Sequence, residues 1–151
     1  MAQDAPDQPL SRDLILGSWR MTSWVTRDVA TGERQDALGQ NPRGTVVYTP
    51  ERVVFLILKN NRARPEQLPP LDEEKIVLFD TMFAYSGSYT VESDRVVHHV
   101  DLSWNEAWTG TDQVRFCKVD EHTLTYTSFP GKIDGREVVH EVTYERERCA
   151  D

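Results

Sequence analysis

The chain has 151 residues, of which 38% are hydrophobic and 28% charged, with a formal net charge of -8 at pH 7. This length suits one domain that buries a core of its own. The 17 basic residues are scattered among 25 acidic ones, which disfavours nucleic acid as a partner because phosphate backbones are bound by clustered Lys and Arg. No apolar run approaches the roughly 20 residues that span a bilayer, so a membrane-embedded protein is not expected.

Residues 1–10 are predicted to be a disordered tail and residues 11–151 one domain. The N-terminal stretch has no base before Arg12 and no apolar segment, unlike a secretory signal or an Arg-rich transit peptide. Two cysteines, Cys117 and Cys149, do not make a disulfide framework, and with four scattered histidines they do not indicate a zinc site. We therefore expect a cytoplasmic protein that binds no metal.

The chain is rich in segments with strand character. In the first, GSWRMTSWVTRD, alternation places Trp19 and Met21 on one face and Trp24 on the other. The run VVFLIL is apolar on both faces and must be covered on both sides. Strands are expected at residues 17–28, 45–49, 52–59, 85–92, 95–104, 111–119, 123–129 and 137–148.

One helix is predicted, over residues 72–84. Asp72 suits its N-cap, and the acidic first turn favours the helix dipole. Ile76, Phe79, Met82 and Phe83 form an apolar stripe that can cover the outside of a sheet. The segment before it, residues 60–71, holds three prolines and is predicted to be a long surface loop.

Consecutive antiparallel strands with a single helix predict the fold class. The connections carry turn residues, such as Ser93-Asp94 and Asp134-Gly135. We expect an all-β, mainly antiparallel protein: a closed up-and-down β-barrel of about eight strands with one α-helix packed against it. Closure removes exposed edges and leaves an interior of ligand size.

Both ends of this predicted barrel resemble known proteins. Gly17-x-Trp19 opens the first strand and Tyr144-Glu145-Arg146 lies in the last, a combination that resembles calycins. The resemblance implies that Trp19 packs beneath Arg146 and closes the barrel. More specifically, residues 14–148 resemble the small lipocalin-like domain family of bacteria and fungi, through GSWRMTSW, NPRG before VVYTP, DEEKIVLF before AYSGSYTV, VVHHV and WTGTDQVR. The chain departs from that family at Glu51-Arg52, where Asp-Gly is frequent, and at Tyr144, where Trp is more frequent.

The resemblance implies a small-molecule cavity and members that include cyclases and isomerases of secondary metabolism. We expect a cofactor-free isomerase, cyclase or dehydratase that acts on an apolar, polyketide- or terpenoid-like metabolite. A non-catalytic carrier of a small hydrophobic ligand is the alternative, and a barrel with a filled interior is a third. Fold alone does not decide among them. No cofactor is implied, since the sequence lacks GxGxxG, a P-loop, G-x-S-x-G and HExxH; a homodimer is left open.

Three residues are the candidate catalytic groups. His98 shares the apolar face of its strand with Val96 and Val100, and an imidazole there suits proton transfer near neutral pH; the alternative is a core histidine satisfied by a hydroxyl. Arg115 is expected to bind or stabilise an anionic oxygen, or else to form a salt bridge to Asp112 or Glu141. Tyr85 is a candidate acid.

The candidate ligand-binding residues are the aromatic and polar side chains expected around the interior. For most of them packing is the competing interpretation, because buried aromatic residues usually serve the core. They are Tyr48, Tyr89, Trp104, Trp108, His140, Gln113 and Phe55.

Overall fold

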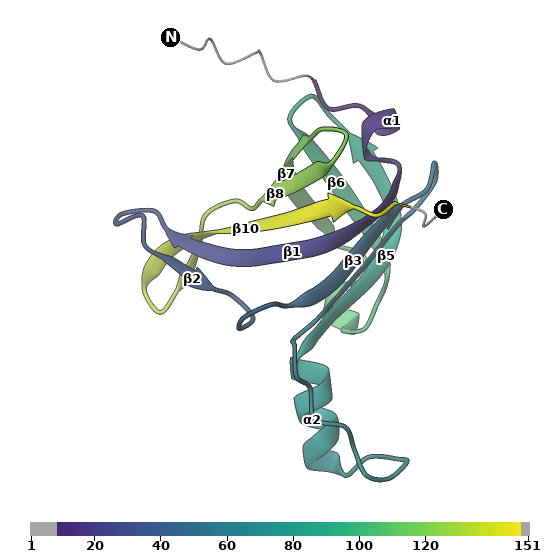
Figure 1. Cartoon of the computed structure of the whole chain (residues 1–151), viewed down its shortest axis with the longest axis vertical. Helices are drawn as coiled ribbons and strands as arrows, with labels where there is room; N and C mark the ends of the chain where they lie inside the picture. The colour runs from purple at the N-terminus through teal and green to yellow at the C-terminus, as the bar shows by residue number, and fades with distance from the viewer. Residues whose placement is uncertain (1–8, 149–151) are drawn as a thin grey trace.

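Figure 1 shows the computed structural model of the chain, which describes residues 9–148. Of the predicted tail, residues 1–8 lie outside the described residues, whereas Leu10 is buried and its N–H donates to the Ser93 carbonyl (3.1 Å). The elements are α1 (Arg12–Ile15), β1 (Gly17–Asp28), β2 (Arg34–Asp36), β3 (Arg43–Tyr48), β4 (Val53–Leu58), α2 (Asp72–Asp80), β5 (Met82–Val91), β6 (Arg95–Ser103), the 3-10 turn η1 (Glu106–Trp108), β7 (Asp112–Val119), β8 (Thr123–Thr127), β9 (Gly131–Ile133) and β10 (Arg136–Arg146).

The strands form a closed antiparallel barrel. Neighbours in the sheet follow the order β1-β3-β4-β5-β6-β7-β8-β10, and β10 returns to pair with β1. Eight strands therefore complete the ring, which confirms the predicted all-β, lipocalin-like barrel. The described residues add two strands that were not predicted, β2 and β9, whose three residues each are too few to show alternation.

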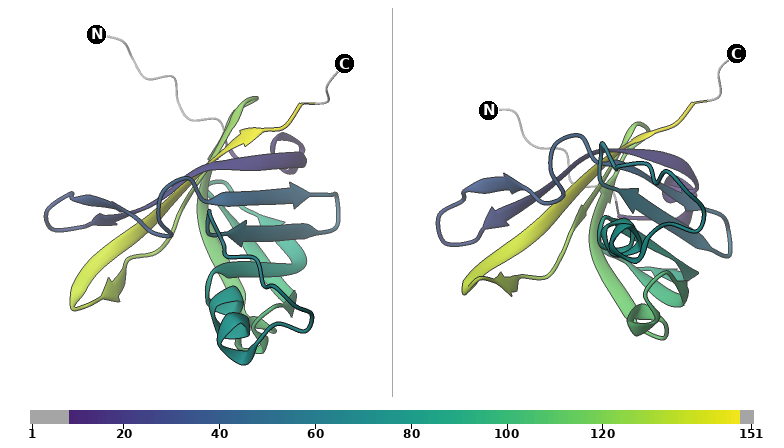
Figure 2. Two further views of the ribbon diagram at one scale, coloured as in Figure 1. Left: turned by 60° about the horizontal axis from the view of Figure 1, so that its bottom comes forward. Right: turned by 90° about the horizontal axis from the view of Figure 1, so that it is seen from below.

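Strands β1 and β10 are longer than the barrel wall. They pair with each other from Trp19↔Arg146 to Asp28↔Val138, but β3 pairs with β1 only from Gly17 to Arg20. Beyond that point β1 and β10, flanked by β2 and β9, form a twisted ribbon that projects to one side of the barrel (Figure 2). We call this ribbon the β1–β10 extension.

One end of the barrel is closed by the pair that the calycin resemblance implies. The Arg146 guanidinium lies 4.1 Å from the centre of the Trp19 ring. It also donates to the carbonyl oxygens of Leu14 and Leu16, both at 2.7 Å. Trp19 is completely buried, so the last strand, the first strand and the turn around α1 are tied together at this end.

Helix α2 lies at the other end of the barrel, below the strands in Figure 1. It ends at Asp80, earlier than predicted, and Met82 and Phe83 begin β5 instead. Its stripe does not cover the outer wall of the sheet: Ile76 is 63% exposed, and Phe79 contacts the barrel through the ring of Trp104. No helix in the described part of the chain is long and apolar enough to cross a membrane.

Candidate functional site

A cavity of about 640 Å³ occupies the barrel end opposite Trp19. Its volume lies within the range of small-molecule sites. Strands β4, β5, β7, β8 and β10 form its walls, together with the segment that leads into β9. Most of its wall is apolar, and the side chains that make it so are Phe55, Ile57, Phe83, Trp108, Val138 and Val142.

A β-bulge in β1 adds Trp24 to this wall. The pairing with β10 shifts register between Met21 and Ser23. Trp19 and Met21 face the interior before the bulge, and Trp24 lies opposite Val142 and lines the cavity after it. Because a bulge inserts one extra residue, it reverses the facing of all residues that follow. The prediction that Trp24 lies on the strand face opposite to that of Trp19 and Met21 was therefore wrong.

Trp24 fixes the protonation pattern of His140. Its indole Nε1–H donates to His140 Nδ1 at 3.0 Å. An indole N–H can only donate, so Nδ1 must be the acceptor, and the neutral imidazole carries its proton on Nε2. Burial, with the charge of Arg115, lowers the pKa of His140 below its usual 6.5, so the ring is neutral at pH 7. His140 thus presents an N–H donor in a wall of the cavity.

Arg115 places a positive charge on the inner wall of the cavity. It lies on the inner face of β7, opposite Val96 of β6. Neither carboxylate proposed as its salt-bridge partner is available: Glu141 binds two arginines of the β1–β10 extension, and Asp112 contacts His99 Nδ1 at 2.7 Å. Within residues 9–148, no ion pair to Arg115 is formed, so the guanidinium can serve an anionic ligand.

His98 lies behind the cavity wall in a hydrogen-bonded network. It faces the interior, as alternation indicated, and is completely buried. Its Nδ1 contacts the Tyr85 hydroxyl at 2.5 Å, and its Nε2 contacts the Tyr48 hydroxyl at 2.6 Å. The Tyr48 hydroxyl in turn contacts that of Tyr126, which lines the cavity. The geometry is that of a core histidine satisfied by hydroxyl groups, with a hydroxyl connection to the cavity.

Burial keeps this network uncharged. It lowers the pKa of His98 well below 6.5, with the charge of Arg115 acting in the same direction. It also raises the pKa of Tyr85 to about 12, although Arg115 opposes the rise. At neutral pH the imidazole and both of its tyrosine partners are therefore neutral, since burial also raises the pKa of Tyr48.

The remaining candidates divide between the cavity and other parts of the barrel. Tyr89 lies away from the cavity: its hydroxyl donates to the Thr49 carbonyl at 2.6 Å, and Arg12 covers its ring. Trp104 packs against Phe83 beside the cavity. The structure gathers Phe55, Trp108, Gln113, Arg115 and His140 around the cavity.

Tyr126, Phe83 and Trp24 are among the residues of the cavity wall that the sequence did not indicate as site residues. Tyr126 shares an inward face with Leu124, and alternation along its strand would have identified it. Phe83 was assigned to the helix, and the bulge concealed Trp24.

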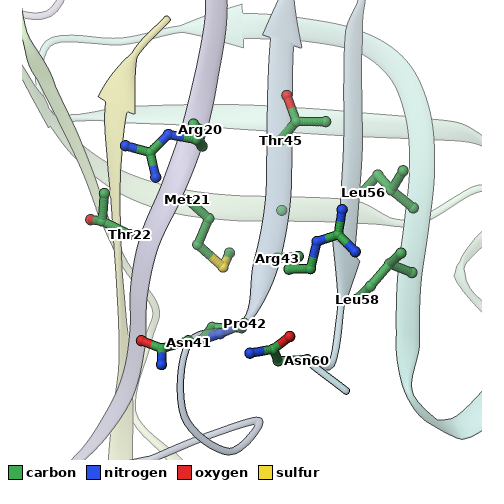
Figure 3. A pocket seen from close by; sticks show the side chains of 11 residues that line it. Arg20, Met21, Thr22, Asn41, Pro42, Arg43, Thr45, Leu56, Leu58 and Asn60 are labelled. Carbon is green, nitrogen blue, oxygen red and sulfur yellow. The ribbon is translucent and has the colours of Figure 1, made fainter. Parts of the chain in front are cut away.

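A second hollow, of about 630 Å³, lies on the outer side of the barrel where β1 separates from β3 (Figure 3). Its lining is more polar and includes Arg20, Arg43, Asn41 and Asn60. Met21 lies in the gap between the two strands and is 3% exposed. This hollow has no part in the His98 network and contains none of the predicted site residues.

Comparison with known proteins gives one match. A family model described as a lipocalin-like domain matches residues 16–147. Neither the search of curated proteins nor that of solved structures found a significant match.

Proposed function

Because the chain belongs to the lipocalin-like domain family, we propose that its barrel binds a small, largely apolar molecule in the cavity at the end opposite Trp19. The observation that carries this proposal is the cavity itself, about 640 Å³ with walls that are mainly aromatic and aliphatic. Binding pockets for small molecules have this composition, with a few polar groups that orient the ligand.

The arrangement of the aromatic rings supports a cyclic ligand. Trp24 and Phe83 meet edge to face, with ring centroids 5.4 Å apart, and the Trp108 ring lies 6.2 Å from that of Phe83. Aromatic side chains bury the ring system of a ligand with little loss of side-chain entropy, because each side chain has only two rotatable bonds. A polycyclic metabolite of polyketide or terpenoid type has this form.

Binding is tested with N-phenylnaphthylamine, a neutral apolar dye that fluoresces when it leaves water. We expect saturable binding to the wild-type protein. Val142→Phe fills the cavity and is expected to weaken binding at least about tenfold, by loss of the space that the dye occupies. Val54→Phe is the matched control, since Val54 is 45% exposed on the outer wall. Equal binding by both variants, or no binding by the wild type, would contradict the proposal.

A second candidate function is cofactor-free acid–base catalysis in the same cavity, as in an isomerase, cyclase or dehydratase. The observation that favours it is the hydroxyl chain from His98 through Tyr48 to Tyr126. Such a chain can carry a proton between a buried imidazole and a bound substrate, while Arg115 stabilises the developing oxyanion. His98 then acts through Tyr126 and does not touch the substrate.

Deuterium exchange separates catalysis from binding. The apolar ketone β-tetralone has acidic protons beside its carbonyl, and NMR in D₂O follows their loss. Catalysis predicts exchange above the buffer rate in the wild type, and a loss of about 10²-fold or more in Tyr126→Phe, which removes one oxygen. A carrier shows no accelerated exchange in either protein, although both bind N-phenylnaphthylamine.

A further inference from the structure

The chemistry of the polar groups in the cavity wall restricts the ligand further. Arg115 supplies a positive charge that, within residues 9–148, has no ion-pair partner. A guanidinium in a partly enclosed site costs free energy unless an anion compensates it. Arg115 Nη1 donates to the Val114 carbonyl at 3.0 Å, but this neutral acceptor does not compensate the charge of the guanidinium.

His140 supplies a second donor with a fixed direction of hydrogen bonding. Trp24 occupies Nδ1, so Nε2 carries the proton and can only donate in the neutral ring. Within the described residues, His140 Nε2 has no protein acceptor, and the atom is not sealed from solvent. Because His140 lines the cavity, the N–H is free to meet a ligand oxygen. Both donors line the same cavity, and the charge of Arg115 contributes to lowering the pKa of His140.

Lys132 and Asp112 are the other two charged residues along the described lining of the cavity. Lys132 lies at the exposed rim. Asp112 is the one carboxylate along the described lining, and its oxygen is engaged with His99, whose other nitrogen contacts Thr90 Oγ1 at 2.7 Å on the outer face. In a chain of net charge -8, this wall is locally positive and rich in donors.

We propose that the ligand is an apolar organic acid, whose delocalised oxyanion (a carboxylate or an enolate) accepts hydrogen bonds from Arg115 and His140 while its ring system packs against the aromatic wall. This inference rests on the proposed function, because it needs the cavity to be the binding site. Planar oxyanions match the guanidinium, which donates two parallel N–H groups. Trp24 is a positioning residue, since it acts on the ligand through the tautomer of His140.

Competition between two compounds of nearly equal shape tests the inference. Naphthoate and acetonaphthone share a ring system and differ in whether a carboxylate or a neutral acetyl group is attached. Each is titrated against bound N-phenylnaphthylamine. We expect naphthoate to displace the dye from the wild type at a concentration about 10- to 100-fold lower than acetonaphthone, the preference of a charge-assisted hydrogen bond.

The variants assign this preference to named atoms. Arg115→Met is expected to reduce this preference to near unity, and His140→Phe to reduce it several-fold. Both compounds compete with the same dye in each variant, so a change in dye affinity cancels from the ratio. Arg43→Met removes a positive charge from the outer hollow of Figure 3 and should leave the preference unchanged. Circular dichroism checks that each variant is folded. If Arg115→Met does not fold, the ratio of the wild type and its change in His140→Phe test the inference.

The outcomes separate this inference from the function on which it rests. A ratio near unity in the wild type, a ratio that survives Arg115→Met, or one that is lost in Arg43→Met overturns the acid-binding inference while dye binding upholds the cavity as a binding site. Failure of the dye to bind the folded wild type removes both.

Discussion

Acidification is expected to destabilise the barrel through His98. Unfolded, this histidine takes up a proton as the pH falls through about 6.5. Folded, it does not, because burial and the charge of Arg115 lower its pKa well below 6.5. The unfolded state therefore binds more protons, and the stability that is complete above pH 6.5 is lost progressively as the pH falls below it. The loss per pH unit approaches about 1.4 kcal/mol until the folded pKa is reached.

Urea unfolding at several pH values between 7.5 and 5.0 measures this slope. His98→Gln keeps a neutral donor and acceptor between Tyr48 and Tyr85, and it cannot take up a proton. We expect the variant to be less stable at pH 7.5, yet to lose up to about 1.4 kcal/mol less per pH unit than the wild type below 6.5. His122→Gln, in an exposed loop, is the matched control and should keep the wild-type slope. Equal slopes in the wild type and His98→Gln would refute the reasoning.

Two further predictions concern the packing of the barrel. A Cβ at Gly87 would lie 1.8 Å from the carbonyl oxygen of His99, so Gly87→Ala should lower the free energy of unfolding by about 3 kcal/mol or prevent folding. A Cβ at Gly131 meets open space, so Gly131→Ala should change the free energy of unfolding by less than about 0.5 kcal/mol. Tyr144 is completely buried, and its hydroxyl has no partner among the described residues. Tyr144→Phe is therefore expected to leave the free energy of unfolding unchanged or to raise it by up to about 1 kcal/mol. Tyr48→Phe breaks two hydrogen bonds and should lower the free energy of unfolding by about 1–3 kcal/mol. A loss of stability in Tyr144→Phe as large as that in Tyr48→Phe would contradict this difference.

Much of the fold followed from sequence because alternation along the strands is a local property. Eight of the strands, the pairing of Trp19 with Arg146 and the inward face of His98 needed only strand parity, turn residues and a family resemblance. Alternation along a strand predicts which face a residue lies on only as far as the first bulge. The bulge after Met21 carries no sequence signal of its own, and it places Trp24 in the cavity wall and not on the predicted face opposite to Trp19.

Alternation along the strands does not predict how deep a residue lies in the barrel. Alternation shows that His98 and His140 both point inward, but not which of them borders the empty part of the interior. That depends on the volumes of the neighbouring side chains, since tyrosines enclose His98 whereas His140 lies near the open end. The predicted C-terminal end of the helix was wrong for a related reason. Met82 and Phe83 continue the helical spacing of apolar residues, yet they belong to β5 and pair with Leu58 and Ile57 of β4.

The β1–β10 extension has a consequence for association between molecules. A ribbon that leaves a closed barrel regains the free edges that closure had removed, and free edges can recruit strands of other chains. Here β2 and β9 cover β1 and β10 along three residues each, and every residue of both strands is exposed. The sequence Arg34-Gln35-Asp36 on one edge, and Lys132 at the centre of the other, place charge where an added strand would have to pair. Short, charged strands of this kind protect the extension against edge-to-edge aggregation.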